Sequence, residues 1–234
     1  MSALFKKGLK AGFPICIGYF PIAVTFGVLA SQTGLNLLEA TGMSIWVFAG
    51  ASQFISLQLI QGGTGILEII IATFIINLRH VLMSTTLSQR VQMSKKMAAL
   101  SSFGITDETF VVATVGSEEE KSFNGIVPTS YFIGIALISY LGWVSGTFIG
   151  ALFAELIPPA IANSMGIGLY SMFIALLTPS LKKSKKIVLI SSFSAITATI
   201  AVYVLNWSSG WAIVAATMLG ALLGTLIPET QKKK

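Results

Sequence analysis

The sequence predicts an all-α integral membrane protein with about seven transmembrane helices and one broken or re-entrant segment near residues 97–116. The first observation is composition: 54% of the 234 residues are hydrophobic and only 10% are charged, whereas soluble domains carry about 25% charged residues. The second is the length of the runs without Asp, Glu, Lys or Arg, because a spanning helix needs roughly 20 apolar residues. These runs are 11–38, 40–67, 122–154, 156–181 and 187–228.

The first predicted segment, about residues 13–31, contains an interior proline, Pro21, with Gly18 one turn before it. A proline inside a helix removes a hydrogen bond and kinks the helix. In a membrane the freed carbonyl needs a partner, so broken helices tend to line protein or a cavity. We therefore predict a helix break at Gly18 and Pro21, which is either an ordinary kink or part of a substrate site.

The second predicted segment, about residues 40–60, has small and polar residues at its centre. Ser52, Gln53 and Ser56 fall on one face of the expected helix. Small residues let helices approach closely, and Gln53 can form a hydrogen bond across such a contact. Helix packing and pore lining both fit this face. A glycine-rich turn at 61–65 joins the segment to the next one as a helical hairpin.

The third predicted segment, about residues 66–87, places polar side chains inside an apolar run. Asn77 and His80, the only histidine, share one helix face, and Arg79 lies beside them. An arginine in hydrocarbon is costly, so Arg79 must reach the interface, a carboxylate or water. Either the helix continues and these groups form a polar stripe, or it ends near residue 80 and Arg79 extends to the interface.

Residues 97–116 contain two apolar pieces that are each too short to span a bilayer alone. Gly104 and Thr106-Asp107 separate them. Thr106 or Asp107 suits a helix N-cap, and Glu108 suits the first helical turn. We predict two half-helices that meet at a break, with Gly104 in it, as a re-entrant or a discontinuous span. The alternative is an exposed amphipathic connector.

The remaining predicted segments are about 127–154, 166–181, 187–205 and 211–227. Two of them carry glycines at every fourth residue, and such a small-xxx-small pattern forms a helix-packing face. The predicted packing residues are Gly142, Gly146, Gly150, Gly220 and Gly224.

We expect one transmembrane domain over residues 1–234, with a weak internal repeat. A constant spacing between corresponding segments predicts two halves, about 13–90 and 125–206. Halves of three spans each would be inverted relative to one another, as in many secondary transporters.

Lysine clusters at 182–186 and 232–234 border apolar runs and indicate cytoplasmic membrane edges. We therefore expect a multi-pass protein of the cell membrane with a cytoplasmic C-terminus. If residues 97–116 do not span, seven spans remain and the N-terminus lies outside, which is the arrangement we favour. If they do span, the N-terminal lysines lie inside.

Composition and motifs exclude several function classes. The chain has no Gly-rich phosphate loop, so it is not expected to use ATP directly. One histidine and one cysteine are too few for a typical zinc site, and we predict no metal and no cofactor. The net charge of +6 fits membrane edges better than nucleic acid, so we predict the lipid bilayer and no nucleic acid as a partner. A Ser-His-Asp triad with His80 and Asp107 is formally available but weak, and we predict no enzyme.

A transport site for an amino acid fits the polar residues best. A zwitterion needs hydrogen-bond donors for its carboxylate and acceptors for its ammonium group. Arg79, Asn77 or the N-terminus of a half-helix can supply the donors. Asp107 and Glu108 can supply the acceptors or carry a proton for coupling.

Four short motifs stand in the chain: GYFPI at 18–22, FAGASQF at 48–54, NLRH at 77–80 and TDETF at 106–110. In this order and spacing they resemble the motifs of AzlC-type permeases, the YgaZ- and BrnF-like large subunits of bacterial branched-chain amino acid exporters. The resemblance covers essentially the whole chain. From about residue 120 onwards the match is mainly in hydropathy and glycine pattern.

The resemblance implies a secondary transporter that exports leucine, isoleucine, valine or related neutral amino acids and is coupled to an ion gradient rather than to ATP. It also implies a small, separately encoded AzlD-type membrane subunit. As our hypothesis, the family motifs place substrate or coupling-ion binding at Gln53, Asn77, Arg79, His80, Thr106, Asp107 and Glu108.

Two other functions stay open on the sequence. A passive channel or facilitator for small polar solutes would keep the polar residues but would need no coupling carboxylate. A non-transporting membrane assembly subunit would need only the glycine packing faces.

Overall fold

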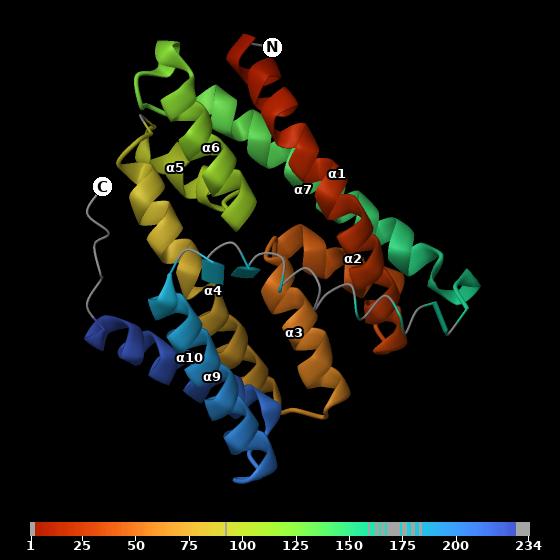
Figure 1. The fold of residues 1–234 in the computed structure, drawn as a ribbon. Coiled ribbons are helices and arrows are strands. Elements are labelled where there is room, and N and C mark those ends of the chain that lie inside the picture. Colours follow the sequence, from red (N-terminus) through yellow and green to blue (C-terminus); the bar gives the residue numbers. More distant parts are fainter. Residues whose placement is uncertain are drawn as a thin grey trace. The chain divides into compact units, whose positions relative to one another are not determined.

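The chain folds into α-helices in the computed structural model shown in Figure 1. The structure describes residues 3–91, 93–158 and 184–227, with isolated positions at 160, 161, 164, 167, 174, 177, 178, 181 and 182. These residues form helices and two short 3-10 turns, and no β-sheet occurs among them. The helices are α1 (Ala3–Gln32), α2 (Leu37–Trp46), α3 (Gly50–Gln61), α4 (Ile66–Ser88), α5 (Lys95–Ser102), α6 (Asp107–Glu119), α7 (Thr129–Leu152), α9 (Lys185–Tyr203) and α10 (Ser209–Leu226).

Within the described residues, five helices are long and apolar enough to cross a membrane: α1, α4, α7, α9 and α10. Their length and composition confirm the predicted all-α membrane protein. The predicted segment at 166–181 lies almost entirely outside the described residues. The predicted total of about seven spans therefore stays a prediction.

The contacts divide the chain into two compact units. One comprises Met1–Phe54 and Asn77–Gly166, and the other comprises Ile55–Ile76 and Ile167–Lys234. The boundary cuts through α3 and α4, so each of these helices contributes one end to each unit. The single domain over 1–234 and its repeat halves at about 13–90 and 125–206 stay predictions.

The first unit is built on α1 and α7, which lie side by side along most of their length (Figure 1). Glycines on both helices make this contact so close that their backbones touch. A Cβ atom added to Gly150 would lie within 2.9 Å of the Cα of Val24, and one added to Gly12 would lie 2.8 Å from the carbonyl oxygen of Ile135. Gly142 and Gly146, two further predicted packing residues, face α1 in the same way.

The break predicted at Gly18 and Pro21 does not interrupt the first helix. α1 continues from Ala3 to Gln32 with Pro14 and Pro21 inside it. A proline removes one backbone hydrogen bond, but the close contact with α7 extends on both sides of Pro21, from Gly12 to Gly27. Packing against α7 therefore supports the helix on both sides of Pro21.

The segment predicted as one helix at 40–60 is divided into two, and our prediction of a continuous helix was wrong here. α2 ends at Trp46 and α3 begins at Gly50; we call residues 47–49 the α2–α3 break. The Ile45 carbonyl, near the end of α2, accepts a hydrogen bond of 3.0 Å from the Tyr140 hydroxyl of α7. A carbonyl freed at a helix end needs such a partner, and this one comes from a distant part of the chain.

The predicted half-helices at 97–116 are present as α5 and α6, separated by residues 103–106, which we call the α5–α6 break. Ser94 caps α5 and Thr106 caps α6. Gly104 lies in this break, where a Cβ atom would come 2.5 Å from the Cβ of Ala136 on α7. Whether the pair is re-entrant stays a prediction.

In the second unit α9 and α10 pack as an antiparallel pair (Figure 1). A Cβ atom on Gly224 would lie 3.1 Å from Ile190 of α9, and Gly220 faces Ser194 of the same helix. Glu68, in the first turn of α4, accepts hydrogen bonds from the Ser208 hydroxyl and, at 2.8 Å, from the backbone N–H of Trp211. Glu68 thus accepts a hydrogen bond from one backbone N–H in the first turn of α10, a helix whose N-cap residue Ser208 forms no capping bond with its side chain.

Candidate functional site

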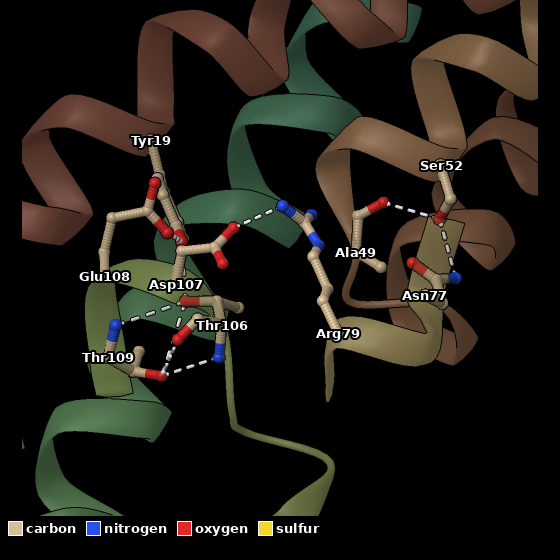
Figure 2. A network of polar contacts seen from close by, with 9 residues as sticks. All are labelled: Tyr19, Ala49, Ser52, Asn77, Arg79, Thr106, Asp107, Glu108 and Thr109. Atoms are coloured by element: carbon tan, nitrogen blue, oxygen red, sulfur yellow. Dashed lines mark hydrogen bonds and ion pairs between the residues drawn. The ribbon is translucent and has the colours of Figure 1, made fainter. Parts of the chain in front are cut away.

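An ion pair joins α4 to α6 in the first unit. Arg79 Nη1 lies 2.5 Å from Asp107 Oδ2, and the two side chains are 36% and 40% exposed (Figure 2). α4 continues from Ile66 to Ser88, so the alternative in which the helix ends near residue 80 is wrong. The sequence required Arg79 to reach the interface, a carboxylate or water, and in the structure Arg79 pairs with the carboxylate of Asp107.

The N-terminus of α6 presents both acidic residues of the TDETF motif. Thr106 and Thr109 form a reciprocal capping box, in which Thr109 Oγ1 accepts from the Thr106 N–H at 2.8 Å. Asp107 and Glu108 then occupy the first turn, where the helix dipole favours negative charge. Because Thr106 and Thr109 are buried, α6 is packed at this end and is not the exposed connector of the alternative prediction.

Tyr19 of α1 is a site residue that the sequence analysis missed. Its hydroxyl donates to Thr106 Oγ1 at 2.7 Å and also contacts the Glu108 carboxylate (Figure 2). A tyrosine needs a partner for its hydroxyl when it is buried, and Tyr19 stands in the GYFPI motif next to the predicted break. The hydroxyl of Tyr19 within an apolar predicted helix was the sequence signal that could have identified Tyr19 as a site residue.

On the other side of Arg79, Asn77 connects α4 to the start of α3. Asn77 Nδ2 donates to Ser52 Oγ at 3.0 Å, and the Ser52 hydroxyl donates to the Ala49 carbonyl at 2.9 Å (Figure 2). Among the described residues, two buried side-chain atoms here lack a hydrogen-bond partner, Asn77 Oδ1 and Arg79 Nε. Unsatisfied buried polar atoms are costly, so one acceptor and one donor remain available for a ligand.

We call this group of side chains the polar junction. It combines one cation, two carboxylates, an amide, hydroxyls and the beginnings of α3 and α6. Its members are Tyr19, Ser52, Asn77, Arg79, Thr106, Asp107 and Glu108.

Gln53 belongs to a neighbouring polar chain. Its side chain is 1% exposed; it accepts from Trp143 Nε1 at 3.0 Å and donates to Ser44 Oγ at 3.0 Å. Ser44 is in turn 2.7 Å from the hydroxyl of Thr147. These bonds tie α2 and α3 to α7 across the α2–α3 break, so in this structure Gln53 links helices.

The remaining predicted residues lie at the edges of the polar junction. His80 follows Arg79 on α4, and its side chain is half-buried. Gly18 precedes Tyr19 and has no atom within 4 Å of an added Cβ. In the part of the chain that the structure describes, no three His, Cys, Asp or Glu side chains come together to hold a metal ion.

The helices and the polar junction define a multi-pass α-helical membrane protein with charged groups at interrupted helices. Its sequence matches the family model described as "AzlC protein" over residues 14–157. This range covers more than half of the chain. The chain therefore belongs to the AzlC family.

Similar proteins are found in bacteria and archaea. An Archaeoglobus fulgidus protein named "Uncharacterized membrane protein" is 34% identical over 95% of this chain and 94% of its own length. The Escherichia coli inner membrane protein YgaZ is 33% identical, with 80% of this chain and 77% of that protein covered. The Bacillus subtilis branched-chain amino acid transport protein AzlC is 24% identical over 79% of this chain and 70% of its length. No solved structure matches the chain.

Proposed function

We propose that this chain is a secondary transporter that exports branched-chain or related neutral amino acids across the cytoplasmic membrane. The observation that carries the proposal is the Arg79–Asp107 pair, flanked by the unpartnered atoms Asn77 Oδ1 and Arg79 Nε. The name of the Bacillus subtilis relative supports branched-chain amino acids as the substrate class.

The geometry supports an exchange of partners at Arg79. A partly exposed ion pair contributes only about 0–1 kcal/mol to stability, so a substrate carboxylate can replace Asp107 at the guanidinium at little cost. The released Asp107 then becomes an acceptor for the substrate ammonium group. Arginine suits this role because its planar guanidinium binds carboxylates through two parallel hydrogen bonds.

Glu108 supports the coupling part of the proposal. It lies one residue after Asp107, its carboxylate contacts the hydroxyl of Tyr19, and it forms no ion pair within the described residues. A carboxylate without a basic partner can take up and release a proton as its surroundings change. We assign Glu108 the proton-coupling role and Asp107 the substrate-exchange role.

The proposal includes a small AzlD-type membrane subunit as a partner. It also includes a cytoplasmic C-terminus, with Lys185 and Lys186 at the cytoplasmic edge of α9. Both rest on the family and on the positive-inside rule.

Efflux of free amino acids from cells fed with dipeptides tests the proposal. Cells express this chain with and without the small subunit and receive leucine-, valine-, methionine- and histidine-containing dipeptides. We expect efflux of the branched-chain amino acids that requires both chains and stops when an uncoupler removes the proton gradient.

The matched control is the triple variant Arg79→Gln, Asp107→Asn and Glu108→Gln, expressed at the same level in the membrane. Unchanged efflux in this variant would contradict the assigned site. Uncoupler-insensitive efflux would instead indicate a passive facilitator. No efflux of any tested amino acid, with both proteins present in the membrane, would contradict the transport function.

A further inference from the structure

Three aromatic rings meet where the two helix breaks approach each other. Phe48 lies in the α2–α3 break and Phe103 in the α5–α6 break, and their ring centroids are 6.4 Å apart. Tyr140 of α7 contacts both rings edge to face, at 5.4 Å from Phe48 and 5.7 Å from Phe103. The two breaks are thus connected through a single aromatic cluster.

This cluster contacts the polar junction on one side and a mainly apolar cavity on the other. The cavity has a volume of about 380 Å³, within the roughly 300–1,000 Å³ of small-molecule sites, and Phe103 and Tyr140 belong to its wall between α5 and α7. On the opposite side Phe48 packs against Tyr19 at 6.0 Å. Since the Tyr19 hydroxyl bonds to Thr106, contacts run without interruption from the cavity wall to the polar junction.

The rings differ in how firmly they are held. Phe48 is 5% exposed, whereas Phe103 is 45% exposed. Tyr140 is anchored on α7, and its hydroxyl donates to the Ile45 carbonyl at 3.0 Å. Phe103 lies at the end of the eight-residue helix α5, which has no buried residue. Movement of Phe103 therefore disrupts the least packing.

Both phenylalanines stand outside helices, at positions where a hinge can act. Short links between helices absorb changes in backbone angles without loss of the hydrogen bonds inside the helices. Such a change at Phe103 itself would carry its ring away from Phe48 and Tyr140, while the buried residues Ile105 and Thr106 stay packed.

We propose that Phe48, Phe103 and Tyr140 form a gate between the polar junction and the cavity beside α5, with Phe103 as the moving ring. What passes the gate rests on the proposed function: an amino acid whose apolar side chain can slide against the aromatic rings. The gate itself rests on the contacts alone.

Cysteine labelling in membrane vesicles tests the gate without any need for transport. Cys16→Ser removes the only native cysteine, and Ser52→Cys introduces one inside the polar junction, where Ser52 is 1% exposed. The rate of reaction with N-ethylmaleimide, which crosses membranes, is measured. We expect Phe103→Ala to raise this rate about two- to tenfold, since it removes two aromatic pairs that close the gate. Phe103→Tyr keeps the ring and is expected to leave the rate unchanged.

Two controls make the result specific. Phe148→Ala truncates a similarly exposed ring on α7, at 42% exposure, and is expected to have no effect. A second reporter, Ala23→Cys at the α1–α7 contact, is expected to stay unreactive in the Phe103→Ala background because Ala23 is fully buried.

An unchanged labelling rate of the Ser52→Cys reporter in Phe103→Ala overturns the gate, as does an equal acceleration at the Ala23→Cys reporter. The latter would mean that the variant loosens the whole unit. Gate-dependent labelling of the reporter, together with no efflux from the chain that keeps Ser52, would keep the gate and contradict the transport function. Normal efflux with labelling that does not respond to Phe103→Ala would contradict the gate alone.

Discussion

The α1–α7 contact and the polar junction hold helices of the same unit together in opposite ways. Between α1 and α7, glycines bring backbone against backbone, and an added Cβ at Gly150 would collide with Val24. At the polar junction, long side chains bridge the helices, and Arg79 reaches Asp107 from α4. The first contact leaves no room for change, whereas the second can exchange partners, so we expect stability to depend on the first and transport on the second.

The largest expected effect comes from dividing the ion pair. Arg79→Gln or Asp107→Asn alone should lower efflux about 10- to 100-fold, because hydrogen bonds to charged groups contribute about 1.5–3 kcal/mol. Because both side chains are more than a third exposed, each single variant should leave the amount of folded protein in the membrane nearly unchanged.

The double variant Arg79→Gln/Asp107→Asn sharpens the comparison. Removing both partners leaves neither charge unpaired, so the protein level should equal that of the parent while efflux stays as low as in the single variants. Western blots of membranes and dipeptide-fed efflux measure the two quantities. Recovery of efflux in the double variant, relative to the single variants, would show that the pair is only structural and would contradict the comparison.

The next effect concerns the glycine contact. Gly150→Ala should lower the free energy of unfolding by about 1–3 kcal/mol, as overpacking does in a close-packed core. The fall in Tm of the detergent-solubilised protein measures it. Gly18→Ala on the facing helix is the matched control, since nothing lies within 4 Å of its added Cβ, and its Tm should stay the same or rise slightly. Equal Tm changes in both variants would contradict close packing as the cause.

A smaller effect is expected from the Tyr19 hydroxyl. Tyr19→Phe keeps the ring contacts with Phe48 and Trp143 but removes the bonds to Thr106 and Glu108. With about 0.5–1.5 kcal/mol for each hydrogen bond, efflux should fall about two- to tenfold with little change in Tm. Tyr203→Phe on α9, where the ring is 80% exposed, should change neither quantity. A large fall in the Tm of Tyr19→Phe would show that this hydroxyl contributes to stability, as the α1–α7 contact does.

The smallest effect belongs to an exposed pair outside both regions. Lys7 hydrogen-bonds to the Glu120 carboxylate and, together with Ser122, lowers the pKa of that group. A lowered folded-state pKa contributes stability that is present above the usual carboxyl pKa and is lost as pH falls through the lowered value. Lys7→Gln should therefore lower Tm slightly at neutral pH and not at all once Glu120 is protonated. An equal Tm difference at acidic pH would show that the effect of Lys7 is not this ion pair.

Local patterns in the sequence were enough to identify most of the scaffold. The apolar runs predicted the long helices, the N-cap signal at Thr106 located the start of α6, and the spacing of Gly142, Gly146 and Gly150 indicated the face that packs on α1. They also selected Arg79 and Asp107 as parts of one site, because a charged group inside an apolar run requires a partner.

Other features depended on residues that are distant in the chain. The helix at 40–60 is divided where the Tyr140 hydroxyl donates to the Ile45 carbonyl and Trp143 Nε1 donates to Gln53, and neither bond leaves a signal near residue 47. α1 stays continuous at Pro21 for the opposite reason, since α7 supports it on both sides.

By itself the sequence determined the membrane class, the long helices and the polar residues that cannot face lipid, because each follows from composition and local periodicity. Only the tertiary structure decided which polar groups form pairs and that the Tyr19 hydroxyl bonds to Thr106. It also decided that the rings of Phe48, Phe103 and Tyr140 are in contact. The physical reason is that hydrogen bonds and ring contacts depend on distances of a few ångströms between residues far apart in the chain, which no local pattern records.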